Sequence, residues 1–415
     1  MFELAQSQRC WHRVVASVTP HFWSKLPVLS IPKRGAVSSL ALADISLNVL
    51  REQNRQLQAT LATIRWPPLS SFWLNRTRYT LPLKAETEWV ETDVYKVAED
   101  ELAYLTGFFD GDGCVTAGAL QVGQSIDGVA TLIRLQEALG GSIRRLKNGR
   151  GLQKPMLNWV LTGRRACHAA NLMALHSIVK RRQLEVLAAL LGTAIDKVDY
   201  SIELAMLKRS ESAVAGPCTW AYLAGFFDAE GYIEQPRGMA LLRLRMYQKY
   251  ATVLECVRTF LATEACIEAH LYQMRGRPGF ELRISRKQCC KAALQKMLDA
   301  GLLRKAAQAK LALSLTSANA QQVRSAMADM VGNQSFATRL DTAGLRRAAL
   351  ITHMKKMAKI YERNGQTSRA NTLFADAEGL QREHVLLNAQ RLNDQLCGYI
   401  DKLQAMRQEH YEYKL

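Results

Sequence analysis

The sequence predicts an α+β protein whose central part consists of two similar halves, flanked by helical segments at both ends. The main observation is a pattern that occurs twice, as YLTGFFDGDGCV over 104–115 and as YLAGFFDAEGYI over 222–233. A pattern repeated in this way indicates two structural repeats related by a pseudo-twofold axis. After each copy, segments with the period of strands are followed by segments with the period of helices.

The first half predicts the element order αββαββαα, and the second half repeats it. Turn residues separate the elements, as at Ala117-Gly118 and Gly140-Gly141. The expected elements are the motif helix, a strand pair ending at Gln124, a helix over 128–139, a strand pair around the turn NGRG, and helices over 166–175 and 180–192. The predicted boundaries are 1–95 for an N-terminal extension, 96–206 for the first repeat, 207–218 for a linker, 219–316 for the second repeat and 317–415 for a C-terminal helical extension.

Gly107 and Gly225 occupy matching positions inside the two apolar helical runs. A glycine inside a helix costs about 1 kcal/mol relative to alanine, so it needs a compensating reason. Close approach of a second backbone is such a reason, and it predicts that the two motif helices pack against each other at these glycines. A further glycine ends each helix. This arrangement places Asp112 and Glu230 together at the bottom of a two-helix interface.

Two acids in these positions need a counter-charge. A carboxylate at a helix C-terminus lies at the unfavourable end of the helix dipole, and two neighbouring carboxylates repel each other. A divalent cation between them would relieve both effects, and hard oxygen ligands suit Mg²⁺. One such motif alone would also fit a buried helix with an acidic end. Because the acid recurs in both copies, we predict that Asp112 and Glu230 hold Mg²⁺ or another divalent cation.

These two motifs resemble those of the LAGLIDADG homing-endonuclease family, in its two-repeat, single-chain form or as a domesticated organellar member. The resemblance implies helices on one face of antiparallel sheets whose other face forms a saddle for DNA. It also implies accessory residues near the acids, namely a glutamine at the end of a strand and the lysine of a Lys-x-x-Gln pattern. Lys180 would alternatively be a solvated helix start, given Arg181 and Arg182 beside it. The catalytic residues implied by the resemblance are Asp112, Glu230, Gln124, Gln248, Lys180 and Lys305.

Strand alternation predicts which side chains face a nucleic acid. Over 242–247, leucine and methionine alternate with two arginines and a tyrosine, and FELRISR repeats the alternation with Glu281 on the polar side. If helices cover the apolar side, the polar side is free for phosphates and base edges. The predicted nucleic-acid contacts are Gln121, Arg144, Arg145, Arg243, Arg245, Tyr247, Arg275, Arg277, Arg283 and Ser285.

The charge favours a polyanionic partner. The formal net charge is +18, and residues 96–316 carry 30 basic and 20 acidic groups, against 11 and 7 in 1–95 and 14 and 10 in 317–415. Nucleic acid is the first candidate partner, although a ribosomal or other organellar protein would also be basic. Because the excess lies in the repeats, a scaffold that binds no nucleic acid is disfavoured.

Cysteine and histidine usage gives no sign of a zinc site or a disulfide framework. The nine cysteines include no CxxC pair, and the eight histidines have no metal-ligand spacing. This usage predicts a reducing compartment. No apolar run is long enough for a membrane span.

The N-terminal 95 residues predict a targeting segment followed by a helix. Between Glu3 and Asp44 there are basic residues and serines but no acid, which is typical of mitochondrial or plastid transit segments. A basic tail without targeting function fits equally well. An amphipathic helix is expected over 41–64, and 66–95 are expected to be irregular, anchored by Trp66, Trp73 and Trp89.

Two features depart from the family pattern. Ten residues separate Gly113 from Gln124, against 16 between Gly231 and Gln248, which predicts a shortened first hairpin and weaker long-site recognition. The C-terminal extension predicts an antiparallel helical hairpin with its turn at Asn364-Gly365, suited to docking a protein or ribosomal partner. Its expected seam residues are Leu350, Met354, Met357, Tyr361, Leu392, Leu396, Tyr399, Leu403 and Met406.

Two functions therefore stand at this point. The first is a Mg²⁺-dependent endonuclease that cuts duplex DNA, with a single chain supplying both halves of the site. The second is a domesticated organellar RNA-binding protein without cleavage activity, acting as an intron-splicing factor or as a component associated with ribosomes.

Overall fold

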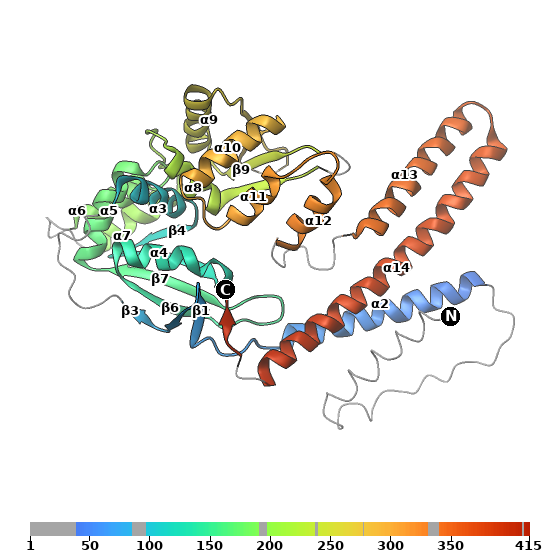
Figure 1. Ribbon diagram of the computed structural model, residues 1–415, viewed down its shortest axis with the longest axis horizontal. Helices are drawn as coiled ribbons and strands as arrows, with labels where there is room; N and C mark the ends of the chain where they lie inside the picture. Colours follow the sequence, from blue (N-terminus) through green and yellow to red (C-terminus); the bar gives the residue numbers. More distant parts are fainter. Residues whose placement is uncertain are drawn as a thin grey trace. The chain divides into compact units, whose positions relative to one another are not determined.

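The computed structural model describes residues 39–84, 97–190, 197–236, 240–276, 278–330, 340–408 and 411–415. The protein is α+β, as predicted, and divides into two compact units (Figure 1). The repeat unit lies within 68–149, 154–331 and 412–415, and the helical unit lies within 1–67, 150–153 and 332–411. Residues 1–38, which contain the predicted transit segment, lie outside the described residues, and so does Trp89.

Each half of the repeat unit places helices against an antiparallel sheet. The first sheet has the strand order β3-β6-β7-β5-β4, and the second has the order β10-β11-β9-β8, so four strands follow the same order in both halves. The first half contains β3 (Leu83–Lys84), α3 (Glu99–Asp112), β4 (Gly113–Thr116), β5 (Ala119–Ser125), a 3₁₀ turn (Ile126–Gly128), α4 (Val129–Leu139), β6 (Ser142–Lys147), β7 (Met156–Thr162), α5 (Arg164–His176), α6 (Arg181–Ala189) and α7 (Lys197–Arg209).

The second half repeats this plan. It contains α8 (Trp220–Glu230), β8 (Gly231–Glu234), β9 (Arg243–Gln248), α9 (Thr252–Ala265), β10 (His270–Gln273), β11 (Phe280–Ile284), α10 (Lys287–Asp299), α11 (Ala306–Leu313) and α12 (Ala320–Met330). The alternation predicted for β9 is observed, because Leu244 and Met246 are buried whereas Tyr247 is exposed. One face of the strand therefore packs under the helices and the other face stays accessible.

The two halves meet along α3 and α8, which lie side by side (Figure 1). A Cβ atom at Gly107 would lie 2.1 Å from the carbonyl oxygen of Tyr222, and one at Gly225 would lie 1.9 Å from that of Tyr104. Residues 102–110 and 221–228 are all buried. Helices that are apolar all round are buried helices, and glycine at the crossing lets their backbones approach closely.

The expectation of a shortened first hairpin is wrong. Its strands β4 and β5 have 4 and 7 residues, and the corresponding β8 and β9 have 4 and 6. The additional residues of the second half lie in the connection between Glu234 and Arg243, of which 237–239 are outside the described residues. The longer spacing between Gly231 and Gln248 therefore reflects a longer connecting loop, and the strands themselves are not longer.

The expectation of irregular structure after Trp66 is also wrong for part of that segment. Strands β1 (Ser71–Leu74) and β2 (Thr77–Thr80) form a hairpin, and β12 (Tyr413–Lys414) pairs in parallel with β1. The turn places Asn75 and Arg76 at φ values of 48° and 68°, a conformation that two-residue hairpin turns need. Phe72 is fully buried and stacks on Tyr79 with a centroid distance of 5.3 Å.

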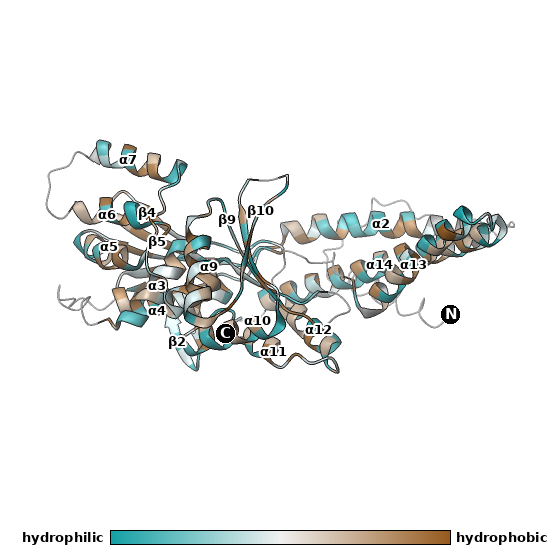
Figure 2. Ribbon diagram, turned by 90° about the horizontal axis from the view of Figure 1, so that it is seen from above, coloured by the Kyte–Doolittle hydropathy of each residue, from teal (hydrophilic) through white to brown (hydrophobic). Residues whose placement is uncertain are grey.

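The helical unit contains α2 (Ser39–Thr63), α13 (Thr342–Arg363) and α14 (Thr367–Gln408). The predicted hairpin is present, since α13 and α14 pack together and Gly365 occupies the turn with φ of 73°. Hydrophobic and hydrophilic stretches alternate along α2 and α14 (Figure 2), as in helices that bury one side. The core of the unit consists of Leu61, Ile64, Leu396, Ile400, Leu403 and Met406.

One seam residue was placed wrongly by the helical period. Leu350 is 50% exposed, whereas its neighbour Ile351 and Ala358 are buried against α14. The residues predicted as the seam on α14 are buried or half-buried, but their partner is α2: Leu396, Leu403 and Met406 form a cluster with Leu61 and Ile64 that contains no residue of α13. On the same side, Asn54 Nδ2 of α2 donates to the carbonyl oxygen of Ala389 at 2.8 Å. Within the described residues, no helix has the length and apolar character needed to cross a membrane.

Candidate active site

The ends of α3 and α8 bring Asp112 and Glu230 together. A Cβ atom at Gly111 would lie 2.3 Å from the Cβ of Ala229 and 3.1 Å from the Cγ of Glu230, so the final turns of the two helices touch. The negative charge of Asp112 contributes to a raised pKa of Glu230, after burial, which is the larger cause. The two carboxylates are therefore close enough to act as one cluster.

Each acid has a glutamine partner on the second strand of its own half. Gln124 at the end of β5 donates from Nε2 to Asp112 Oδ2 at 2.7 Å. Gln248 at the end of β9 forms a side-chain hydrogen bond with Glu230, which lowers the pKa of that carboxyl and partly offsets the effect of burial. A donor fixed on a strand holds each carboxylate in one orientation.

Lys180 and Lys305 lie behind the carboxylates and do not occupy solvated helix starts. The Lys180 ammonium donates to the last carbonyl oxygens of α3, at 3.0 Å to Phe109 and also to Asp110, and Lys305 donates to the carbonyl of Asp228. A cation at a helix C-terminus is favourable because those carbonyls carry the negative end of the dipole. Burial lowers the pKa of Lys180, and it lowers the pKa of Lys305 to about 8, although the charge of a neighbouring aspartate opposes the shift in each case.

A second pair of acids, Asp110 and Asp228, organises the site from inside. Asp110 is fully buried and accepts hydrogen bonds from Ser177 Oγ at 2.6 Å and from the backbone N–H groups of Ile178, Val179 and Lys180. It thereby fixes the chain where Lys180 begins α6.

Asp228 plays the same part in the second half. It is fully buried and accepts from the backbone N–H groups of Leu303, Arg304 and Lys305 at 2.7–2.9 Å. Reciprocal hydrogen bonds also join the two halves. The hydroxyl of Tyr222 donates to Asp110, and the hydroxyl of Tyr104 donates to Asp228, both at 2.7 Å. Sequence reasoning assigned no role to these four residues, although each pair is identical between the two motif copies.

Arg304 breaks the symmetry of the site. Its Nη1 lies 3.4 Å from Asp112 Oδ2, so the acid of the first half is paired with a cation from the second half. The residue preceding the lysine in the first half is Val179, which cannot provide such a pair. Sequence reasoning did not single out Arg304, and the only available signal was this difference between the two lysine patterns.

The residues present fit a divalent cation. Asp112 and Glu230 offer oxygen ligands at adjacent helix ends, and their repulsion contributes to the raised pKa of Glu230. Hard cations such as Mg²⁺ are bound through one or two carboxylates together with substrate phosphates and water. Among the described residues no group of three or more His, Cys, Asp or Glu side chains is placed to hold a metal ion.

The coupling of the two acids predicts a measurable shift in Asp112→Asn. Loss of the Asp112 charge should lower the pKa of the Glu230 carboxyl, because one of the two causes that raise it is removed. An acid with a raised native pKa loses stability as pH rises from its ordinary pKa through the native one, so the variant should lose less stability across that window. Carbon NMR of glutamate carboxyls in the metal-free protein would measure the shift. Asp127→Asn is the control, and equal pKa values of Glu230 in Asp112→Asn and wild type would contradict the coupling.

The predicted nucleic-acid face of the second half is rich in ion pairs. Glu281, expected to point outward, is 3% exposed because Arg245 and Arg283 cover it. Burial opposes the ionisation of Glu281, but hydrogen bonds from the two arginines hold its pKa below the usual range. Arg245 also lies 3.3 Å from Glu234, and Arg243 lies 3.9 Å from the same carboxylate. These guanidinium groups are therefore held in fixed orientations.

The other predicted nucleic-acid contacts differ in exposure and in the partners they bind. In the first half, Arg144 is exposed on β6, whereas Arg145 donates to the carbonyl oxygen of Leu69 at 3.5 Å. Gln121 forms a 3.5 Å contact with Thr116 within the strand pair β4–β5. In the second half, Tyr247 donates to the carbonyl of Pro278, Ser285 and Arg275 are exposed, and Arg277 lies outside the described residues.

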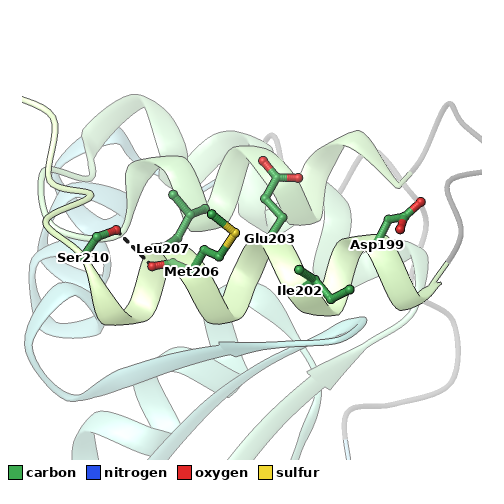
Figure 3. Close-up of a pocket in the computed structure, with 6 residues that line it drawn as sticks. All are labelled: Asp199, Ile202, Glu203, Met206, Leu207 and Ser210. Carbon is green, nitrogen blue, oxygen red and sulfur yellow. Dashed lines mark hydrogen bonds between the residues drawn. The ribbon is translucent and has the colours of Figure 1, made fainter.

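A separate hollow lies along α7 (Figure 3) and contains none of the predicted site residues. Ile202 and Met206 are 55% and 65% exposed there, and Ser210 Oγ donates to the carbonyl oxygen of Met206. All of its side chains come from one helix and its end. This shallow surface lacks the opposing wall that a ligand site needs.

Comparison with known proteins finds weak matches among solved structures. No model of a known protein family matches the chain, and no curated protein sequence matches it. The LAGLIDADG meganuclease I-AabMI, solved bound to uncleaved DNA, is 16% identical over 55% of this chain and 99% of its own, with a TM-score of 0.41. The LAGLIDADG homing endonuclease I-GzeII, in complex with its DNA target, is 11% identical over 55% and 96%, with a TM-score of 0.40. I-SmaMI, bound to cleaved DNA, is 11% identical over 57% and 97%, with a TM-score of 0.38.

The paired motifs of this chain resemble those of LAGLIDADG homing endonucleases. At these identities and TM-scores the structural similarity is weak. The assignment of the site residues rests on the contacts within this chain, described above.

Proposed function

We propose that the protein is a Mg²⁺-dependent endonuclease that hydrolyses both strands of duplex DNA. The observation that supports this most is the repeated constellation at the ends of α3 and α8. Each half supplies one carboxylate, one glutamine on a strand and one lysine behind the helix end. Two similar sets around one helix pair suit a substrate with two strands.

The chemistry assigned to the cation is general to phosphodiester hydrolysis. When bound, Mg²⁺ would polarise the scissile phosphate and favour deprotonation of the attacking water. Asp112 and Glu230 would hold it as oxygen ligands, and Gln124 and Gln248 would keep those carboxylates oriented. With a native pKa of about 8, Lys305 is mostly charged at neutral pH and would stabilise negative charge developing on the phosphate.

The open faces of the two sheets would bind the duplex. Guanidinium groups that are already paired with Glu281 and Glu234 lose little conformational freedom on binding and keep N–H groups for phosphates or base edges. Because these pairs neutralise part of the face, the second half offers less free positive charge than its arginine count indicates. Binding would then depend on salt less steeply than that count implies.

Selection of cleavable sites from a random duplex library tests the proposed activity. The full chain is incubated with the library in Mg²⁺, and linear fragments with new ends are sequenced. We expect double-strand cuts at a narrow set of sequences and none when Ca²⁺ replaces Mg²⁺, because Ca²⁺ supports binding with less demanding coordination. A folded protein that cuts no member of the library but binds structured RNA would overturn the proposal in favour of the RNA-binding alternative.

A further inference from the structure

The positive charge of the helical unit is concentrated on one helix. α13 contains six basic residues and one acid. In contrast, α2 has two basic and two acidic residues, and α14 has five of each. Neighbouring helices of one bundle thus differ sharply in charge, although all three contribute to the same unit.

The charge on α13 forms a stripe on the face turned away from α14. Arg346, Lys356, Lys359 and Arg363 are all exposed, and at 100° per residue they fall within an arc of about 140°. The buried residues Ile351 and Ala358 lie on the opposite side of the helix. The four side chains, here called the basic stripe, span about 26 Å of helix at 1.5 Å per residue.

The basic stripe has no internal counter-charge among the described residues. No ion pair joins any of its four side chains to an acid in the described ranges of the chain, although such pairs form elsewhere, as between Arg391 and Asp341 at 3.9 Å. The single acid of α13, Glu362, falls outside the arc of the stripe. A polyanion that binds this face would neutralise its charges and release the counterions around them.

We propose that the basic stripe of α13 is a second binding surface, one that takes the phosphate backbone of duplex DNA independently of its sequence. A row of cations along one helix face complements a duplex that carries one negative charge per about 1.7 Å of its axis. The major groove of B-form DNA, about 12 Å wide, accepts an α-helix, whereas that of A-form RNA does not admit side chains. The inference does not rest on the proposed nuclease activity.

A lipid surface is a less suitable partner. Basic helices that lie on membranes insert an apolar face into the bilayer. In α13 the apolar face is already used, because Ile351 and Ala358 are buried in the contact with α14. The exposed aliphatic side chains beside the stripe are Leu350 and Ile360, at 50% and 37% exposure, and two such residues offer little insertion.

The test compares two variants of the full chain with equal change in charge. The stripe variant carries Arg346→Gln, Lys356→Gln, Lys359→Gln and Arg363→Gln. The control variant carries glutamine at four exposed basic positions of α2 and α14, namely Arg51, Arg382, Lys402 and Arg407. Binding to a 40-base-pair DNA duplex of arbitrary sequence is measured by fluorescence anisotropy over a range of salt concentrations in Ca²⁺.

We expect the stripe variant to bind at least tenfold more weakly. Its slope of log affinity against log salt should fall by up to about 3.6, at about 0.9 per lost phosphate contact, whereas the control should change little. Equal losses of DNA affinity in both variants would overturn the proposal. The same binding is measured with anionic phospholipid vesicles and with an RNA duplex, and a stripe variant that loses affinity only for one of these would also overturn it. Circular dichroism shows whether the stripe variant folds. If it does not, the test is lysine acetylation of the wild-type protein, compared with and without DNA. DNA must then protect Lys356 and Lys359 and leave Lys402 reactive, and unprotected Lys356 and Lys359 would overturn the proposal.

Discussion

Gly225→Ala is expected to destabilise the repeat unit by about 3 kcal/mol or more. The added Cβ would lie 1.9 Å from the carbonyl oxygen of Tyr104 and 2.8 Å from the backbone nitrogen of Phe108. Both neighbours are backbone atoms of α3, so no side-chain rotation relieves the clash and the two helices must separate. Separation also lengthens the hydrogen bonds that Tyr104 and Tyr222 make across the interface. The gain in helix propensity, about 1 kcal/mol, does not offset this cost.

Gly379→Ala on α14 is the matched control. A Cβ atom there meets nothing within 4 Å, so the substitution should stabilise the helix by about 0.5–1 kcal/mol. Amide hydrogen exchange is measured separately for α3, α8 and α14. A single unfolding midpoint would average over the two units, whereas exchange reports the stability of each helix. Equal protection of α3 and α8 in Gly225→Ala and in wild type would show that the helices do not cross at this glycine.

The second large effect is expected for the acids. Asp112→Asn and Glu230→Gln should each reduce the rate of DNA cleavage by about a thousandfold or more, on both strands, because the two carboxylates act as one cluster. Each substitution keeps the shape of the side chain and removes the charge that holds the cation. DNA affinity in Ca²⁺ should stay within about tenfold of wild type, since the arginine-bearing strands β9 and β11 are untouched.

Glu137→Gln on α4 removes an exposed acid away from the helix pair and should leave the cleavage rate unchanged. Rates are measured in single-turnover reactions, with each strand carrying its own fluorophore. Cleavage by Asp112→Asn at the wild-type rate, in a folded protein, would exclude that carboxylate from the reaction.

The helix pair and its acids were predictable because their constraints are local and occur twice. Gly107 and Gly225 are costly in a helix unless backbones meet there, and the structure places each against the carbonyl of the other helix. The positions of Asp112 and Glu230 were predictable because each acid directly precedes the glycine that ends its helix. The strand alternation around Met246 likewise predicted a buried face and an open one, and both are observed.

What could not be predicted depends on contacts between distant segments. Asp110 caps backbone groups about 70 residues later in the chain, and its tyrosine partner, Tyr222, lies in the other half. Glu281 has the pattern of an outward residue, and it is covered by Arg283, two residues further along β11, and by Arg245 on the neighbouring strand β9. The turn at Asn75-Arg76 lacks the glycine that usually reveals a two-residue hairpin.

The wrong estimate of hairpin length has a similar cause. Residue counts between Gly113 and Gln124, and between Gly231 and Gln248, contain strand and loop together. The structure assigns strands of similar length to both halves, which removes the reason for expecting weaker recognition by the first half. Long-site recognition is thus compatible with this fold, and the selected library sites would measure its extent.

Binding of Mn²⁺, read by electron paramagnetic resonance, tests most directly whether Asp112 and Glu230 form a divalent cation site against DNA. The full chain is titrated with Mn²⁺ in the presence of a duplex taken from the selected library, and free Mn²⁺ gives the sharp signal. We expect the wild-type complex to bind Mn²⁺ at least tenfold more tightly than the Asp112→Asn/Glu230→Gln double variant bound to the same duplex. Equal Mn²⁺ affinity of the two complexes would contradict the metal site and, with it, the proposed reaction.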